Sequence, residues 1–128
     1  MSSPAGAVRG IGVDAVDVER FRRALQRTPS MRQRLFTAEE LAYVAPKQDP
    51  VPSLAARFAA REAVMKAMGL GLGAFGFHEA WVERAASGEP SLVVVGRAAE
   101  LAADRGITTW LLSITHTATV AIAYVVAT

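Results

Sequence analysis

The sequence contains no cysteine, only two histidines and no long run of apolar residues. The lack of cysteine excludes disulfides, thiolate catalysis and cysteine-ligated zinc or iron–sulfur sites. Two histidines are too few for a three-histidine zinc site within one chain. The longest apolar run, residues 120–127, is far shorter than the roughly 18 residues that a membrane span needs, and no apolar segment of signal-peptide length precedes Asp14. We therefore expect a cytoplasmic protein.

The composition is that of a folded domain with a basic N-terminal part. A chain of 128 residues is expected to form one domain, and 52% hydrophobic with 20% charged residues argues against disorder. Residues 1–7 are small and polar and are expected to be mobile. The net charge is only +2, yet residues 1–35 hold seven arginines against three acidic residues. This excess favours an acidic partner.

The N-terminal part reads as a strand followed by a basic helix. A strand is predicted over residues 8–13, ending at Asp14, and Asp17 is a suitable N-cap for a helix that begins at residue 18. The apolar residues of this helix recur on one face. The opposite face carries three arginines at helical spacing, Arg20, Arg23 and Arg27.

The rest of the chain predicts helices and strands in alternation. A capping-box pattern opens a short helix after residue 37, and Ser53 is expected to cap the strongest helix, over residues 54–68. A glycine-rich loop, residues 69–76, ends that helix. The remaining predictions are strands 80–84 and 91–95, helix 97–104, and strands 108–115 and 118–126. Together they predict an α+β domain with a mainly antiparallel sheet packed on a long central helix.

Three places carry residues that could do chemistry, and each also has a purely structural interpretation. Asp14 could bind a hard cation, or it could cap a helix or a turn. Glu62 and Lys66 project from one helix face and could form a site or an ordinary exposed ion pair. His116, between two threonines where two strands meet, could be functional or structural. The residues alone leave these alternatives open.

Three motifs, taken in order, resemble those of the holo-acyl-carrier-protein synthases, the small group of 4′-phosphopantetheinyl transferases. They are Gly10-Ile-Gly-Val-Asp14 with the helix that follows it, residues 57–69 (RFAAREAVMKAMG), and Ser113-Ile-Thr-His-Thr117. Their order and spacing match over nearly the whole chain, residues 9–126. Each motif alone is weak, whereas three in register at this length are specific. The resemblance implies transfer of 4′-phosphopantetheine from coenzyme A to a serine of an apo-acyl carrier protein, with release of 3′,5′-ADP.

The resemblance also implies roles for particular residues. Asp14 and Glu62 match the family's two magnesium-binding carboxylates, and with Lys66 they form its catalytic group. Such a site agrees with the preference of Mg²⁺ for one or two carboxylates together with phosphate oxygens and waters. The general base is left open between Glu62 and a water on the metal. The implied contacts to coenzyme A are Arg57, Lys66, Gly69 and His116.

The family's assembly and partner lead to further expectations. Members of this size are homotrimers with active sites between subunits, and the helix after the aspartate motif docks the acidic carrier protein. Arg20 and Arg27 match basic docking positions, Arg23 joins them by helical spacing alone, and Arg22 is assigned to a solvated face. Where the family usually has lysine, this chain has Arg61, which keeps the charge but differs in geometry and proton chemistry. We therefore expect Arg61 to contact phosphate rather than to transfer a proton.

Two other functions fit parts of the sequence. A non-catalytic module could bind acidic protein or RNA through the arginine face of the first helix, without metal or coenzyme A, although few aromatic residues lie nearby for stacking on single-stranded nucleic acid. A magnesium-dependent hydrolase of nucleotide pyrophosphates could use the same carboxylates. We expect no nucleic-acid and no membrane partner. The sequence does not specify whether the carrier belongs to fatty-acid synthesis, to a large synthase or to polyketide synthesis.

Overall fold

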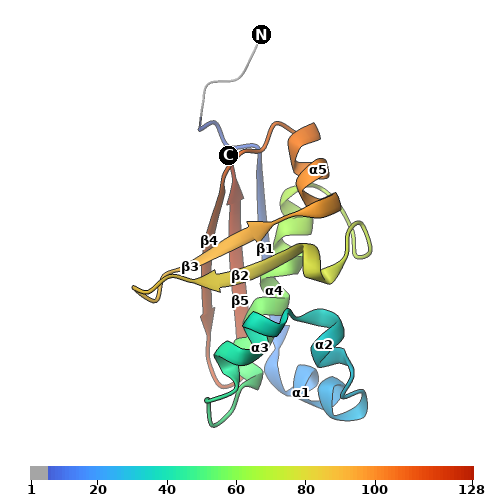
Figure 1. Cartoon of the computed structure of the whole chain (residues 1–128), viewed down its shortest axis with the longest axis vertical. Coiled ribbons are helices and arrows are strands. Elements are labelled where there is room, and N and C mark those ends of the chain that lie inside the picture. Colours follow the sequence, from blue (N-terminus) through green and yellow to red (C-terminus); the bar gives the residue numbers. More distant parts are fainter. Residues whose placement is uncertain (1–5) are drawn as a thin grey trace.

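Helix α4 (Val51–Ala67) runs through the middle of the protein, between a three-stranded sheet and a two-stranded hairpin (Figure 1). The structure is a computed structural model that describes residues 6–128, so the expected mobility of residues 1–7 lies almost wholly outside the described residues. The other elements are β1 (Gly10–Asp17), α1 (Val18–Arg27), α2 (Met31–Leu35), α3 (Ala38–Val44), the 3-10 helix η1 (Phe77–Glu79), β2 (Ala80–Arg84), β3 (Pro90–Val94), α5 (Gly96–Asp104), β4 (Trp110–His116) and β5 (Val120–Ala127). The predicted α+β fold on a long central helix is confirmed.

The three-stranded sheet has the order β1-β5-β4, and both outer strands run antiparallel to β5. Because successive residues of a strand point to opposite faces, one face of this sheet packs on α4 and the other points outward. Ala121, Ala123 and Val125 of β5 are fully buried against the helix side. On the outward face, the register partners Val13 and Tyr124 are 50% and 44% exposed. The sheet therefore has one covered and one uncovered face.

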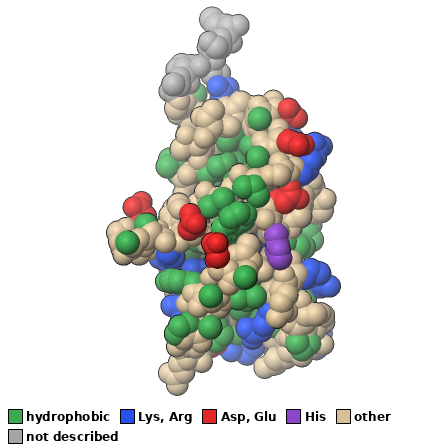
Figure 2. Space-filling view, viewed as in Figure 1, with side chains coloured by type: hydrophobic (Ala, Val, Ile, Leu, Met, Phe, Trp, Pro, Cys, Tyr) green, Lys and Arg blue, Asp and Glu red, His purple; other side chains and the backbone are tan. Residues whose placement is uncertain are grey.

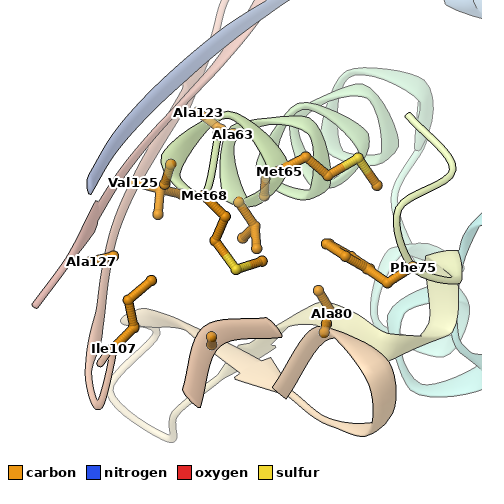
Figure 3. Packing of buried hydrophobic residues seen from close by; sticks show 14 of the residues in the cluster. Ala63, Met65, Met68, Phe75, Ala80, Ile107, Ala123, Val125 and Ala127 are labelled. Carbon is orange, nitrogen blue, oxygen red and sulfur yellow. The ribbon is translucent and has the colours of Figure 1, made fainter. Parts of the chain in front are cut away.

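The core fills the space around α4. Figure 3 shows Ala63 and Met65 of α4, and Met68 directly after the helix. They lie between Val125 of the sheet and Phe75 of the loop that follows the helix. The many alanines of α4 are fully buried and allow close approach of the strands. None of the helices within residues 6–128 has the length and apolar character needed to cross a bilayer.

Two glycines bring β1 directly against α4. A Cβ on Gly10 would lie 1.9 Å from the carbonyl oxygen of Ala67, and a Cβ on Gly12 would lie 1.9 Å from that of Ala63. Only glycine fits at such a backbone approach. Asp14 is two residues beyond Gly12 on the same face of the strand, so this contact also fixes how far its carboxylate lies from the helix.

Local capping predictions are confirmed where they depend on neighbouring residues. Asp17 accepts a hydrogen bond from the amide of Arg20 at 2.8 Å and caps α1. Thr37 and Glu40 form the expected capping box at the start of α3. The hairpin of β2 and β3 pairs antiparallel, as the turn signal predicts.

Most element ends differ from the prediction by one to three residues, and two of these differences concern the site. β1 does not end at Asp14 but continues to Asp17, because β5 offers backbone partners as far as Val120. Helix α4 begins at Val51, so Ser53 is a buried helical residue and not the cap. Proline is favourable in the first turn of a helix, where amide groups have no intrahelical acceptor, and Pro52 therefore starts the helix rather than preceding it.

Candidate active site

Asp14 and Glu62 line one cavity of about 560 Å³ between β1, α1 and α4. We call this the carboxylate cavity. Its other lining residues are Ala15, Val16, Asp17, Arg20, Phe21, Ala24, Met31 and Phe58. One end is therefore acidic and bordered by Arg20, and the rest is largely apolar. The structure brings together two residues that lie on separate motifs of the sequence.

Lys66 bonds to Asp14 rather than to Glu62. Its Nζ donates to Oδ1 of Asp14 at 2.9 Å and to the backbone oxygen of Val13 at 3.1 Å. The interpretation of Glu62 and Lys66 as an ordinary surface pair is therefore set aside. Asp14 caps neither a helix nor a turn, since Asp17 caps α1 and Asp14 lies within β1. The ion pair that does form joins Lys66 to Asp14 and so connects two of the sequence motifs.

The surroundings of Glu62 disfavour its negative charge. Burial first, and then the charge of Asp14, raise the pKa of the Glu62 carboxyl above its usual value, while Lys66 opposes this shift. Two carboxylates in one cavity are a donor set that a cation stabilises. Within residues 6–128, no group of three or more His, Cys, Asp or Glu side chains is placed to hold a metal ion. Two carboxylates completed by oxygens from a phosphate and water are a pattern that Mg²⁺ accepts.

A second cavity, of about 270 Å³, is lined by two arginines and three glutamates, and its positive groups gather at one aromatic ring. It is built on the ring of Tyr43, whose centroid lies 4.8 Å from the guanidinium carbon of Arg57, 5.6 Å from that of Arg84 and 5.3 Å from Nζ of Lys47. Glu39, Glu40, Val82 and Glu83 complete the lining. We call this the cationic cavity. It has no lining residue in common with the carboxylate cavity.

Two guanidinium groups of the cationic cavity have unused donors. Arg57 is only 2% exposed, and one of its Nη atoms donates to the carbonyl of Ser53. The buried Nε atoms of both Arg57 and Arg84 have no hydrogen-bond partner. Burial, and then the positive charge of Arg84, lower the pKa of Arg57. Buried donors of this kind are rare in folded proteins, and an anion would satisfy both their charge and their hydrogen bonds.

Arg61 does not face either cavity as a phosphate ligand. Its side chain and that of Glu40 are 0% exposed, and the two form an ion pair inside the protein. The expectation that Arg61 contacts phosphate is therefore wrong for this structure. The helix turns Arg61 toward α3 and η1, whereas its neighbour Glu62 faces the carboxylate cavity.

The remaining implied contacts to coenzyme A lie apart from the carboxylate cavity. His116 is exposed at the end of β4 and lines neither cavity. Gly69 is exposed directly after α4, with a φ of 71° that favours glycine. Arg57 is in the cationic cavity. Among the four implied contacts, Lys66 alone is bonded to a residue of the carboxylate cavity.

The basic helix α1 begins beside the carboxylate cavity. Arg20 lines the cavity, and Arg23 and Arg27 are exposed further along the helix. Arg22, which was assigned to a solvated face, lies at the surface, where it makes two hydrogen bonds to Asp49, at 2.9 and 2.7 Å, and also pairs with Glu19. On the face shown in Figure 2, the charged side chains visible over the lower end, where α1–α3 lie, are Lys and Arg.

Several residues of these cavities were not singled out from the sequence. Tyr43 and Arg84 were missed, whereas Arg57 was named from the family resemblance; the three come from different elements, so no spacing pattern joins them. Glu40 was identified only as part of a capping box. Because capping alone explains a glutamate at this position, nothing in the sequence indicated that Glu40 also has a second role. Phe58 could have been found from its place next to Arg57, one turn before Glu62 on α4.

Comparison with known proteins gives one consistent family. A profile described as the 4'-phosphopantetheinyl transferase superfamily matches residues 10–125. A holo-[acyl-carrier-protein] synthase of Micrococcus luteus is 48% identical over 92% of this chain and 90% of that protein. One of Frankia casuarinae is also 48% identical, over 94% of this chain and 98% of that protein.

Solved structures of the same group share the fold. The holo-[acyl-carrier-protein] synthase of Neisseria meningitidis has a TM-score of 0.85 and 32% identity, covering 94% of this chain and 98% of that chain. A synthase of Bacillus anthracis, solved in complex with CoA (3′,5′-ADP), has a TM-score of 0.78 and 28% identity, covering 94% and 96%. The matched span includes both carboxylates of the carboxylate cavity. The chain therefore belongs to the 4′-phosphopantetheinyl transferase superfamily, in its holo-[acyl-carrier-protein] synthase group.

Proposed function

We propose that this chain is an enzyme that transfers 4′-phosphopantetheine from coenzyme A to a serine of an acyl carrier protein. In this reaction the serine hydroxyl gives its proton to a general base and its oxygen bonds to the phosphorus next to pantetheine. The bond from that phosphorus to the bridging oxygen breaks, and 3′,5′-ADP leaves with the bridging oxygen. The observation that carries the proposal is the meeting of Asp14, Glu62 and Lys66 beside a basic helix in a chain of this family. The expected cytoplasmic location stays a prediction.

Asp14 and Glu62 would hold Mg²⁺, and Lys66 would neutralise further phosphate oxygens. The fit rests on the donor set: two carboxylates in one cavity, with the pKa of Glu62 raised by burial and by the charge of Asp14. When bound, Mg²⁺ offsets the negative charge that builds on the pyrophosphate leaving group. Lys66 already lies at 2.9 Å from Asp14, so its ammonium is placed at the edge of the same anionic site.

The cationic cavity would bind the phosphorylated nucleotide end of coenzyme A. Arg57 and Arg84 line it, each with a buried Nε that has no partner, and both guanidinium groups lie against the ring of Tyr43. A phosphate group accepts hydrogen bonds from several guanidinium donors at once. Arg57 thereby takes the nucleotide role that the family resemblance implies, with Tyr43 and Arg84 as its partners.

The active sites would lie between the subunits of a homotrimer. The carboxylate cavity and the cationic cavity have no common lining residue, and a second chain would complete the surface that one long ligand needs to reach both. The outward face of the sheet supplies an apolar surface, with Ile11 and Leu111 each 55% exposed beside Val13 and Tyr124. Large exposed apolar surfaces of this kind mark protein interfaces.

The carrier protein would dock on the basic face of α1, which consists of Arg20, Arg23 and Arg27. These side chains are exposed, and Arg20 also borders the carboxylate cavity. An acidic carrier held on this face places its serine beside Asp14 and Glu62. Charges at such a rim mainly raise the association rate and make it sensitive to salt.

The test is incubation with an apo-carrier protein, coenzyme A and Mg²⁺, followed by intact mass of the carrier. We expect a mass gain of one phosphopantetheine, and we expect Asp14→Asn and Glu62→Gln to abolish it while circular dichroism shows the fold intact. Coenzyme A cleaved without carrier modification would identify a pyrophosphate hydrolase instead. No reaction with any of several carriers, and no magnesium-dependent binding of coenzyme A, would leave the non-catalytic binding module.

A further inference from the structure

Within residues 6–128, Glu40 and Arg61 form an ion pair in which both charged side chains are fully buried. Nη1 of Arg61 donates to Oε2 of Glu40 at 2.9 Å and Nη2 donates to Oε1 at 2.5 Å, and neither side chain is exposed. Removal of two charges from water costs free energy that their attraction often fails to recover. Stability alone therefore does not explain the pair. A fully bonded polar network can instead fix one arrangement of the elements around it.

The pair joins four elements. Oε1 of Glu40 accepts from the amide of Thr37 at 2.9 Å, and Oε2 accepts from the amide of Val82 in β2 at 3.2 Å. Nε of Arg61 donates to the carbonyl of Phe77 in η1 at 2.7 Å. Since Glu40 belongs to α3 and Arg61 to α4, one bonded group connects α3, α4, η1 and β2.

Three of these elements each supply one wall of the cationic cavity. Tyr43 follows Glu40 by about one turn on α3, and Arg57 precedes Arg61 by about one turn on α4. Arg84 follows Val82 by two residues of β2 and so points to the same face of the strand. Movement of the ion pair would therefore displace all three walls together.

The two arginines of this cavity need other contacts to hold them close together. Arg57 and Arg84 face one aromatic ring with like charges, and like charges repel. Three carboxylates of opposite sign line the same cavity, those of Glu39, Glu40 and Glu83, and Glu40 is the one that Arg61 orients. The backbone oxygen of Arg57 also accepts from Nη1 of Arg61 at 3.3 Å.

We propose that Glu40 and Arg61 are positioning residues that hold Tyr43, Arg57 and Arg84 in the arrangement that binds the nucleotide phosphate of coenzyme A. Arg61 does not line the cavity, and the carboxylate of Glu40, which does, carries a charge that repels phosphate, so the pair acts by holding the walls and not by binding the ligand. The inference rests on the proposed function of the cationic cavity, and it gives Arg61 a role different from phosphate contact.

The test compares affinity with stability in variants of the full chain. Glu40→Gln/Arg61→Met removes both charges together, so no unpaired charge is left inside the protein and the fold is expected to survive. We expect its dissociation constant for 3′,5′-ADP, measured by calorimetry, to rise about tenfold or more while its melting temperature stays near that of the wild type. The KM for coenzyme A should rise with it, whereas kcat should change less than about twofold.

A conservative variant and a control complete the experiment. Arg61→Lys keeps the charge but loses the two-pronged contact, so we expect a folded protein whose affinity for 3′,5′-ADP is only about threefold weaker. Asp49→Asn breaks the exposed pair with Arg22 and should leave that affinity unchanged.

Each outcome decides the question. Wild-type affinity in the folded double variant overturns the positioning role, and if that variant does not fold, wild-type affinity in Arg61→Lys overturns it equally. Arg84→Ala tests the proposed function of the cavity separately from the positioning role of Glu40 and Arg61. If Arg84→Ala also binds 3′,5′-ADP as tightly as the wild type, the cavity itself does not bind the nucleotide.

Discussion

At the scale of single residues, the carboxylate cavity is a place where neighbouring charges control one another. The charge of Asp14 acts on Glu62, Lys66 opposes it, and Lys66 is in turn bonded to Asp14. A group in such a position responds predictably when one neighbour is removed, because each charge shifts its protonation in a known direction.

The protonation of Glu62 in the metal-free protein gives the first prediction. Asp14→Asn removes a negative neighbour and should lower the pKa of Glu62 toward its usual value, whereas Lys66→Met removes a positive neighbour and should raise it further. The measurement is an NMR titration of the Glu62 carboxyl carbon. Addition of Mg²⁺ to the wild type should lower this pKa and release protons. Shifts of the opposite sign in the two variants would contradict the described arrangement.

The sequence predicts residues that act through neighbours in the chain or through a family motif, and it misses those that meet only in space. Asp14 and Glu62 were identified because each lies in a recognisable motif. The ion pair between Glu40 and Arg61 was not predicted, because the two residues are far apart in the sequence. The end of α3, the loop before α4 and the first turns of α4 lie between them. The cationic cavity was missed for the same reason, as it needs α3, α4 and β2 together.

At the scale of elements, the packing of β1 on α4 sets the geometry of the site. The two are in contact through backbone atoms at Gly10 and Gly12, so the strand cannot shift without moving Asp14. Local signals predicted the caps of α1 and α3 correctly. They failed at the end of β1 and the start of α4, where a partner strand and a proline decide the boundary.

Gly12→Ala tests this contact. The added Cβ would lie 1.9 Å from the Ala63 carbonyl oxygen, which forces strand and helix apart, and overpacking of this kind costs about 1–3 kcal/mol of the free energy of unfolding. Transfer activity should fall even well below the melting temperature, because Asp14 moves away from Glu62. Gly71→Ala is the matched control: nothing lies within 4 Å of a Cβ there, and the free energy of unfolding should change by less than about 0.5 kcal/mol.

Glu79 gives a pH-dependent prediction for the helix α5. No side chain of the preceding residue caps this helix, and Oε2 of Glu79 instead accepts from the amides of Arg97 and Ala98. The hydrogen bond from the Gly76 amide, above all, lowers the pKa of Glu79. A carboxyl with a lowered folded-state pKa stabilises the fold above its unfolded value, about pH 4.3, and this contribution is lost as the pH falls further.

The measurement is the melting temperature of Glu79→Gln and wild type as a function of pH. At pH 7 the variant should melt at a lower temperature, and the two curves should converge toward pH 3, where the wild-type carboxyl is protonated as well. Glu89→Gln, in the turn of the hairpin, should follow the wild-type curve throughout. A constant difference at all pH values would show that the charge of Glu79 is not what caps α5.

At the scale of the whole molecule, the two cavities and the uncovered sheet face bear on whether one active site is built from more than one chain. Coenzyme A carries its reacting pyrophosphate and its nucleotide end on one molecule, whereas this chain has a carboxylate cavity and a cationic cavity with no lining residue in common. Association through the outward face of β1, β5 and β4 would bury Val13, Leu111 and Tyr124. Tyr124→Glu should therefore give a folded monomer in sedimentation and lose transfer activity.

Mixing of two inactive variants tests whether each site is shared between subunits. Asp14→Asn removes the carboxylate half and Arg84→Ala the cationic half, so neither variant alone should transfer phosphopantetheine efficiently. When equal amounts are refolded together, roughly a quarter of the interfaces in a randomly mixed ring join two intact halves, and about that fraction of wild-type activity should return. If both halves of a site came from the same chain, every chain would carry a damaged site and mixing would restore nothing. Recovery therefore shows directly that the carboxylates of one subunit work with the arginines of the next.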